Sequence, residues 1–217
     1  MQREEILREY GEEKALKVVA QLNKRGFKGR CFPTLAEAVE AALEIIPAGA
    51  SIGVGGSVTV RESGLLPELA KRGHTIHDHW QSRDAAERRQ TMKAQQNSGV
   101  FLASTNAVTL KGQLVNVDGT GNRVSSMIFG PDMVLIMAGV NKIAADLDMA
   151  LWMVKNVSAS LNYKRLQVEP APPCVSQGKC GDCELPLRQC STTVILDSVP
   201  RAVKEYHVFI INENLGL

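Results

Sequence analysis

The 217-residue sequence has few aromatic residues and almost no net charge. Aromatic side chains make up 5 % of the chain, and 25 basic residues stand against 23 acidic ones, which leaves a net charge of +2. Proteins that bind nucleic acids usually combine a basic surface with aromatic side chains that stack on bases. The composition therefore argues against a nucleic-acid partner.

Long apolar runs are also missing from the chain. No window of about 18 uncharged apolar residues occurs, so we expect no membrane-spanning helix and no membrane partner. The segment MQREEILREY at the start is charged where a signal peptide would be apolar. We therefore expect a cytoplasmic protein. With 44 % hydrophobic and 22 % charged residues, the composition is that of a folded globular domain rather than a disordered chain.

Short apolar strands alternate with amphipathic helices along most of the chain. Helices are predicted over 3–25, 35–46, 65–72, 84–96 and 146–156. Strands are predicted over 51–54, 74–77, 100–103, 133–138, 193–196 and 208–211, with a hairpin between 108–110 and 114–117. This alternation indicates a three-layer α/β/α fold, in which helices cover both faces of one sheet, and a single domain over residues 1–217.

Cysteine is unevenly distributed. Four of the five cysteines, Cys174, Cys180, Cys183 and Cys190, lie in a segment with several prolines, 170–191. The prolines exclude a regular helix or a central strand, so we expect a loop inserted in the domain. In a reducing compartment, clustered thiols bind metal more often than they form disulfides, and we expect these four to be metal ligands. The isolated Cys31 is expected to pack as a small apolar residue.

The spacing Cys-x5-Cys-x2-Cys-x6-Cys is compatible with two kinds of metal centre. Four thiolates can hold an iron–sulfur cluster or a tetrahedral zinc ion. The spacing matches neither the ferredoxin run nor the paired knuckles of a zinc ribbon. We favour an iron–sulfur cluster, of the [4Fe–4S] type, over zinc, because the family resemblance described below points to redox metabolism and because a chain of this length folds without a structural metal. Free or disulfide-paired thiols are the remaining alternative.

A glycine-rich turn follows the predicted strand 51–54. Its residues are Gly53, Gly55, Gly56, Ser57 and Thr59. We expect the glycines to adopt positive φ angles and to let the backbone approach an anion, with the two hydroxyls beside it. The motif is neither a dinucleotide fingerprint nor a P-loop. A tight strand-to-helix turn that binds nothing is the alternative.

Further polar residues stand near the ends of predicted strands and hairpins. They are Asn106, Thr109, Asn122, Arg123 and Lys142. Ligands of open α/β sheets collect at the carboxyl ends of strands, so we expect Lys142 to share a pocket with the glycine-rich turn. Arg123 is suited to a bidentate grip on a carboxylate or phosphate, unless it lies in a solvated turn. We assign this set and the glycine-rich turn to binding of an anionic ligand.

Catalytic candidates are Glu62, Arg123 and Lys142. Glu62 is a candidate general base or nucleophile, with an acid in the first turn of a helix as the preferred alternative. The group His74, His77 and His79 is a weaker candidate for a metal site, since such residues are more often hydrogen-bonded groups at a strand end.

Several of these motifs, in this order, resemble one known family. They are Gly53-x-Gly55-x-Ser57-x-Thr59-x-x-Glu62-x-Gly64, Asn106-Ala107-x-Thr109, Gly121-Asn122-Arg123 and Gly139-x-x-Lys142. Over about residues 15–215 the chain resembles the LUD domain of lactate-utilisation proteins. The resemblance implies a NagB/RpiA/CoA-transferase-like fold. It also implies a role in oxidising L-lactate to pyruvate together with iron–sulfur partner subunits.

The combined prediction is a redox or electron-transfer component of an oxidoreductase system. It would carry a Cys-ligated iron–sulfur cluster and bind a small anionic metabolite such as a 2-hydroxy acid. One alternative is a CoA-transferase-like or phosphosugar-isomerase-like enzyme with a structural zinc. Another is a non-catalytic regulatory subunit. Assembly into an oligomer stays open.

Overall fold

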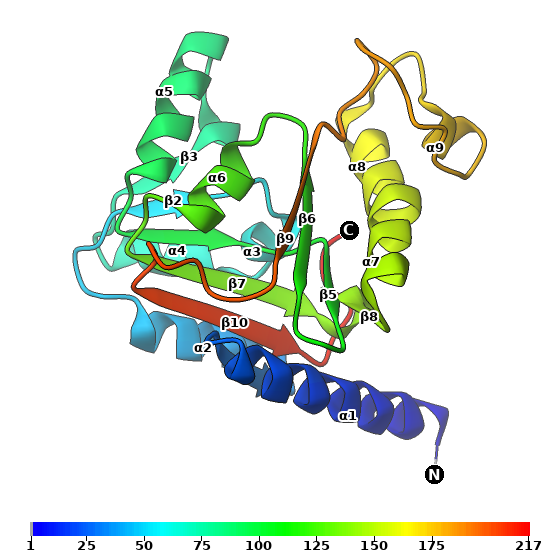
Figure 1. The fold of residues 1–217 in the computed structure, drawn as a ribbon. Helices are drawn as coiled ribbons and strands as arrows, with labels where there is room; N and C mark the ends of the chain where they lie inside the picture. The colour runs from blue at the N-terminus through cyan, green and yellow to red at the C-terminus, as the bar shows by residue number, and fades with distance from the viewer. Residues whose placement is uncertain (1) are drawn as a thin grey trace.

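Six parallel strands form the main sheet of the computed structural model, which describes residues 2–217. In order across the sheet they are β1 (Lys28–Phe32), β10 (Glu205–Ile211), β7 (Met133–Gly139), β4 (Val100–Ala103), β2 (Ile52–Val54) and β3 (Ile76–Asp78) (Figure 1). The four central strands are buried almost throughout. A parallel sheet covered on both faces has this property, which explains their continuous apolar sequences.

Alternate residues of the central strands face two separate cores. In β7, Leu135 points into the core beneath α2 (Leu35–Ile45) and α4 (Leu65–Lys71). The next residue, Ile136, points into the core beneath α1 (Arg3–Lys24). Helices therefore lie on both sides of a parallel sheet, as the alternating pattern predicted.

A second sheet, which the single-sheet prediction lacked, packs against the α1 side of the main sheet. Its strands, in order, are β8 (Ile143–Ala144), β5 (Ala107–Thr109), β6 (Leu114–Asp118) and β9 (Thr192–Leu196). The β5–β6 hairpin was expected. Its pairing with β9 was not, because β9 lies far along the chain and the apolar pattern of a strand does not identify its partner.

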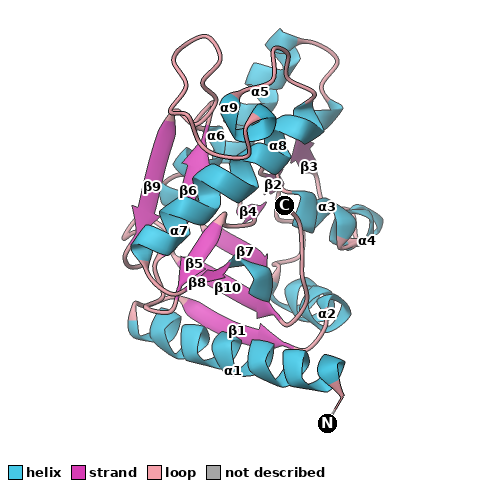
Figure 2. Ribbon diagram, turned by 90° about the vertical axis from the view of Figure 1, so that its right-hand side faces the viewer, coloured by secondary structure: helices cyan, strands magenta, loops and turns pink. Residues whose placement is uncertain are grey.

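One long helical rod covers the outer side of the second sheet (Figure 2). It consists of α7 (Leu147–Met153), the π-helical turn η3 (Val154–Ser158) and α8 (Ala159–Leu166). The sequence predicted a helix ending near residue 156, and the structure extends it to Leu166, by nearly three turns. A π turn holds an extra residue, and such turns often occur at functional sites.

The other helices are short, apart from α5. They are α3 (Val58–Glu62), η1 (His79–Gln81), α5 (Ala85–Gln96), α6 (Asn122–Ile128), η2 (Val140–Lys142) and α9 (Pro173–Ser176). The predicted caps of α2 and α5 are present, since Thr34 accepts from the amide of Glu37 and Asp84 from that of Glu87. Each such cap is worth about 1 kcal/mol.

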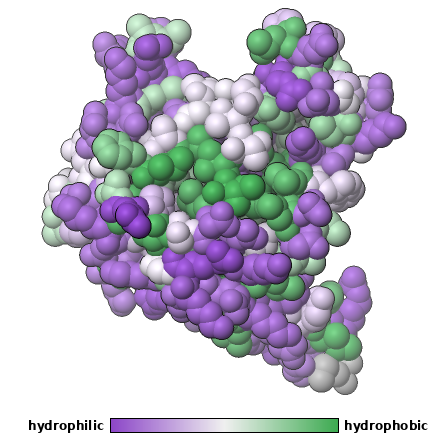
Figure 3. Space-filling view, viewed as in Figure 1, coloured by the Kyte–Doolittle hydropathy of each residue, from purple (hydrophilic) through white to green (hydrophobic). Residues whose placement is uncertain are grey.

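The cysteine segment 170–191 is a loop between α8 and β9 and contains only α9 as regular structure. It extends past the end of α8, away from the main sheet (Figure 1). On the face drawn in Figure 3, polar side chains follow α1 and apolar ones gather across the middle. Within residues 2–217, every helix is too short or too polar to cross a bilayer.

The expectation of positive φ angles in the glycine-rich turn was wrong. Gly53, Gly55 and Gly56 are not among the residues with positive φ. The first two are needed for close packing instead. A Cβ on Gly53 would lie 2.6 Å from Ser98 Oγ and 2.7 Å from the carbonyl oxygen of Gln95, and a Cβ on Gly55 would lie 3.2 Å from Cγ of Arg123.

We predict that Gly53→Ala destabilises the protein by about 1–3 kcal/mol, because its methyl group meets the backbone at the end of α5. Gly99→Ala is the matched control, since the nearest atoms to its Cβ are 3.6 Å away, and it should leave stability unchanged or slightly raised. Urea denaturation measures both. Equal stability of the two variants would contradict the packing role.

Candidate functional site

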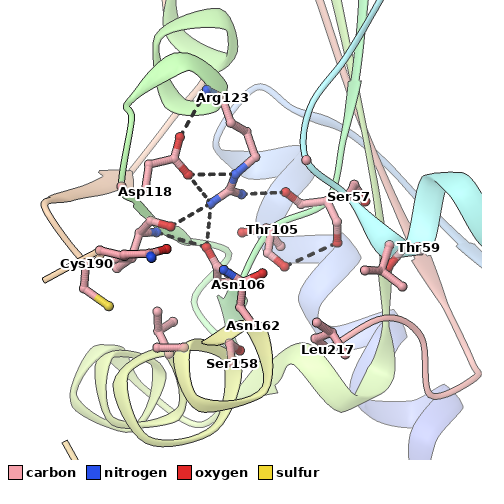
Figure 4. A pocket seen from close by; sticks show the side chains of 18 of the residues that line it. Ser57, Thr59, Thr105, Asn106, Asp118, Arg123, Ser158, Asn162, Cys190 and Leu217 are labelled. Carbon is pink, nitrogen blue, oxygen red and sulfur yellow. Dashed lines mark hydrogen bonds and ion pairs between the residues drawn. The ribbon is translucent and has the colours of Figure 1, made fainter. Parts of the chain in front are cut away.

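A cavity of about 180 Å³ lies at the carboxyl ends of three neighbouring strands, and we call it the inner chamber. Residues 56–59 follow β2, residues 104–106 follow β4, and Lys142 follows β7; all of them line the cavity. Strands of a parallel sheet end at the same edge, which brings these distant segments together. Figure 4 shows Ser158 and Asn162 of the helical rod on the opposite wall.

A buried ion pair between Arg123 and Asp118 forms one wall of the inner chamber (Figure 4). The side chains are only 10 % and 8 % exposed, and Nε of Arg123 donates to Oδ1 of Asp118 at 2.9 Å. The other carboxylate oxygen accepts the amides of Arg123 and Val124, which begin α6. Asp118 therefore both neutralises the guanidinium and caps the helix that carries it.

The remaining Arg123 donors are also occupied by protein acceptors. Nη1 donates to the carbonyl of Ser104 at 2.9 Å and to Oδ1 of Asn116 at 2.7 Å. Nη2 donates to Oδ1 of Asn106 at 2.7 Å and to the carbonyl of Val117 at 3.1 Å. Every N–H group of the guanidinium therefore has a protein acceptor. Arg123 stabilises the wall and has no donor free to bind a ligand.

Lys142 is the unopposed cation of the inner chamber. It is 5 % exposed, and its ammonium group has no hydrogen-bond or ion-pair partner among residues 2–217. Burial lowers its pKa to about 8. The buried hydroxyl-bearing residues Ser57 and Thr59 line the same space. A buried charge without a partner is costly, and an anionic ligand beside it would remove that cost.

The structure brings most of the predicted binding residues to the inner chamber. Gly56, Ser57, Thr59, Asn106, Arg123 and Lys142 line it. Thr109 does not, because its side chain bonds Gln113 in the β5–β6 turn. Asn122 lines a neighbouring cavity.

Glu62 lies away from both cavities. It is exposed and stands in the last turn of α3 rather than the first. The alternative of an acid stabilised at a helix N-terminus was therefore wrong for Glu62.

The sequence analysis missed several residues of the chamber. Ser104 and Thr105 follow β4 directly, and the rule that ligands collect at strand ends would have found them. Ser158 and Asn162 lie one helical turn apart on the rod. Finding them required knowing that the helix continues beyond residue 156.

The four clustered cysteines lie near one another. Burial and the proximity of Cys183 and Cys180 raise the pKa of Cys174. Burial and the proximity of Cys174 and Cys180 raise the pKa of Cys190. As the side chains are placed, no three potential ligands among residues 2–217 converge on one point, so a formed metal site is not confirmed. The all-thiol donor set nevertheless fits an iron–sulfur cluster or zinc.

Cys190 belongs to both the cysteine cluster and the inner chamber. Tyr163 of α8 fixes the chain just before Cys190. Its hydroxyl donates to the carbonyl of Leu187 at 3.0 Å and accepts the amide of Gln189 at 2.7 Å. Cys31 lies elsewhere, on β1, and packs against the core as expected.

The histidines form no shared site among the described residues. His74 Nδ1 lies 2.8 Å from the carbonyl of Ala50, and the buried His79 Nδ1 lies 2.9 Å from Nε2 of Gln95. Burial, with Arg88 and Arg61 nearby, lowers the pKa of His79.

A parallel sheet flanked by helices defines an α/β protein, and its polar cavity lies at the carboxyl ends of the strands, where open α/β sheets bind small ligands. The chain belongs to the LUD domain family, whose model matches residues 15–211. No curated protein matches it.

Two solved structures show some similarity to the chain. A crystal structure of a DUF162 family protein from Deinococcus radiodurans is 11 % identical, with 93 % of this chain and 98 % of that chain covered and a TM-score of 0.55. This likeness shows a shared fold. The eIF2B delta structure from Chaetomium thermophilum is 16 % identical, covers 54 % of this chain and 51 % of that one, and has a TM-score of 0.34, too low to support an argument.

We predict that Asp118→Ala lowers the free energy of unfolding by about 3–5 kcal/mol, because it leaves the guanidinium of Arg123 buried without its counter-charge. The control is Asp132→Ala, which breaks an exposed pair with Lys204 and should cost less than about 1 kcal/mol. Urea denaturation distinguishes the two. A cost for Asp118→Ala as small as that of the control would refute the proposed role of the pair.

Proposed function

We propose that this LUD-domain protein is a redox component in the oxidation of lactate or a similar 2-hydroxy acid. In this proposal the inner chamber binds the small carboxylate, and Cys174, Cys180, Cys183 and Cys190 hold an iron–sulfur cluster of the [4Fe–4S] type. Iron–sulfur partner subunits would exchange electrons with it. The observation that supports the proposal is that Cys190 lines the inner chamber.

The carboxylate of the ligand would lie against Lys142. The chamber is small, about 180 Å³, and its only unpaired cation among the described residues is this lysine. A single positive charge matches a monoanion such as lactate or pyruvate. The side chains of Ser57 and Thr59 offer hydroxyl groups that can orient the ligand by accepting or donating hydrogen bonds.

Tyr163 and Arg188 would hold the cysteine loop. Tyr163 bridges two backbone groups beside Cys190, and Arg188 donates to the carbonyl of Cys183 and pairs with Asp182. The cation of Arg188 also lies close enough to Cys190 to favour its thiolate form. A cluster bound there would supply one-electron transfer at the edge of the ligand chamber.

Replacing Lys142 tests the binding half of the proposal. Lys142→Met keeps the length of the side chain and removes the charge, so lactate and pyruvate should bind about 10- to 100-fold more weakly. The control Lys155→Met removes an exposed lysine outside both cavities and should leave binding unchanged. Calorimetric titration measures the affinities, and equal affinity in the two variants would contradict this role.

The pH dependence of binding gives a second test of Lys142. The pKa of this lysine is about 8 in the free protein, so the amine is charged below that pH and loses its proton above it. Affinity for lactate should therefore be constant from pH 6 to 7.5 and fall as the pH rises through 8, by up to tenfold per unit. In Lys142→Met the affinity should not change over this range. A wild-type profile as flat as that of the variant would contradict the assignment.

Metal analysis tests the redox half of the proposal. Protein purified without oxygen should contain about four irons and four acid-labile sulfides per chain. Cys180→Ser should lower both, whereas Cys31→Ser, far from the loop, should change neither. Zinc without sulfide would refute the redox role and favour an enzyme with a structural metal.

A further inference from the structure

A second cavity, of about 440 Å³, adjoins the inner chamber, and we call it the outer chamber. The two share a wall made of Gly56, Asp118, Gly119, Arg123, Asn162 and Gln189. The outer chamber is larger and lies between η1 and α5 on one side and α8 on the other, as its lining residues show. The two cavities are therefore direct neighbours.

The outer chamber carries unopposed positive charge. Arg88 of α5 and Arg165 of α8 line it; both are exposed to solvent, and neither forms an ion pair with an acidic residue among residues 2–217. Among residues 2–217, the only hydrogen-bond acceptor of the Arg165 side chain is the amide oxygen of Asn162, 3.1 Å from Nε and 2.7 Å from Nη2. Asp118 is the only carboxylate among the lining residues described, and Arg123 already neutralises it. Two guanidinium groups from different helices are suited to a doubly charged anion.

Trp80 gives the outer chamber a rigid aromatic wall. The guanidinium carbon of Arg61 lies 3.6 Å from the centre of its ring, and that of Arg165 lies 4.5 Å away. Arg61 is itself anchored by its ion pair with Asp78. These cation–π contacts hold the indole in place.

The indole N–H of Trp80 is a donor without a partner among residues 2–217. Its nitrogen lies 3.7 Å from the point that a Cβ of Gly56 would occupy, at the wall between the chambers. Asn122 and Thr120, at the start of α6 and just before it, bring further polar groups to the same cavity. Arginine, indole N–H, amide and hydroxyl groups together form the kind of donor set that surrounds a phosphate group.

We propose that the outer chamber binds the phosphate group of a phosphate ester whose acid end occupies the inner chamber. The assignment of the acid end rests on the function proposed above, whereas the phosphate site rests on Arg88, Arg165 and Trp80 alone. The natural ligand is then larger than lactate: a small hydroxy or oxo acid joined to a phosphate. Lys142 holds the single negative charge, and the two arginines hold the double one.

Calorimetric titration with three probes tests this proposal. The probes are lactate, inorganic phosphate and 3-phosphoglycerate, which is a 2-hydroxy acid with a phosphate on carbon 3. The ester should bind at least tenfold more tightly than either of the others. If inorganic phosphate binds as tightly as the ester, the ester assignment is overturned and the site is one for free phosphate.

Charge-removal variants locate the site. Arg165→Gln and Arg88→Gln should each weaken binding of 3-phosphoglycerate at least tenfold and leave lactate binding unchanged. Arg89→Gln removes a neighbouring arginine that is equally exposed but lines neither cavity, and it should change neither affinity. Because Arg165 packs on Trp80, thermal unfolding is used to check that Arg165→Gln is still folded. Arg88→Gln tests the same site without disturbing that packing.

The two proposals fail in different ways. Unchanged affinity for the ester in both Arg165→Gln and Arg88→Gln overturns the phosphate site, whatever Lys142→Met does. Unchanged lactate affinity in Lys142→Met, with phosphate binding still dependent on the two arginines, overturns the inner-chamber assignment and leaves the phosphate group in place.

Discussion

The buried pair of Arg123 and Asp118 is the constraint on which the site depends. Its hydrogen bonds join the segment after β4, the strand β6 and the start of α6, which are separate in the sequence. The pair also forms part of the wall between the two chambers. Because the two charges of the pair cancel, the electric field in the two chambers comes from Lys142, Arg88 and Arg165. These three cations form no ion pair with a carboxylate among residues 2–217.

Much of the main sheet could be predicted from the sequence, because its signals are local. The caps at Thr34 and Asp84 fixed the starts of α2 and α5, and the apolar run from Met133 marked a strand covered on both faces. The rule that ligands collect at strand ends also brought Lys142 to the glycine-rich turn, since β2, β4 and β7 are neighbours. Motif order identified the family correctly.

Features that depend on distant contacts could not be predicted. The pairing of β6 with β9 defines the second sheet, and no local pattern carries it. From the sequence, Gly53 was expected to adopt a positive φ angle. A glycine is needed there because the end of α5 packs closely against it, and this contact exists only in the folded structure. Arg123 looked like a free anion-binding group, yet its acceptors come from segments that only the fold assembles. The outer chamber could not be predicted because Trp80 and Arg165 lie on elements that only the tertiary structure brings together.

The helical rod contains one π turn, at Val154–Ser158. Because of this turn, the number of residues in the rod and the direction in which the side chains of α8 face are not strictly linked. A π turn absorbs one residue more than an α turn, so α8 continues in the phase set by α7. Losing one residue inside this turn would leave a plain α-helix with Asn162 still facing the chambers. Losing one residue inside α8 would turn Arg165 away by about 100°. The loss of one residue at this point would therefore shorten the rod without changing the direction in which the side chains of α8 face.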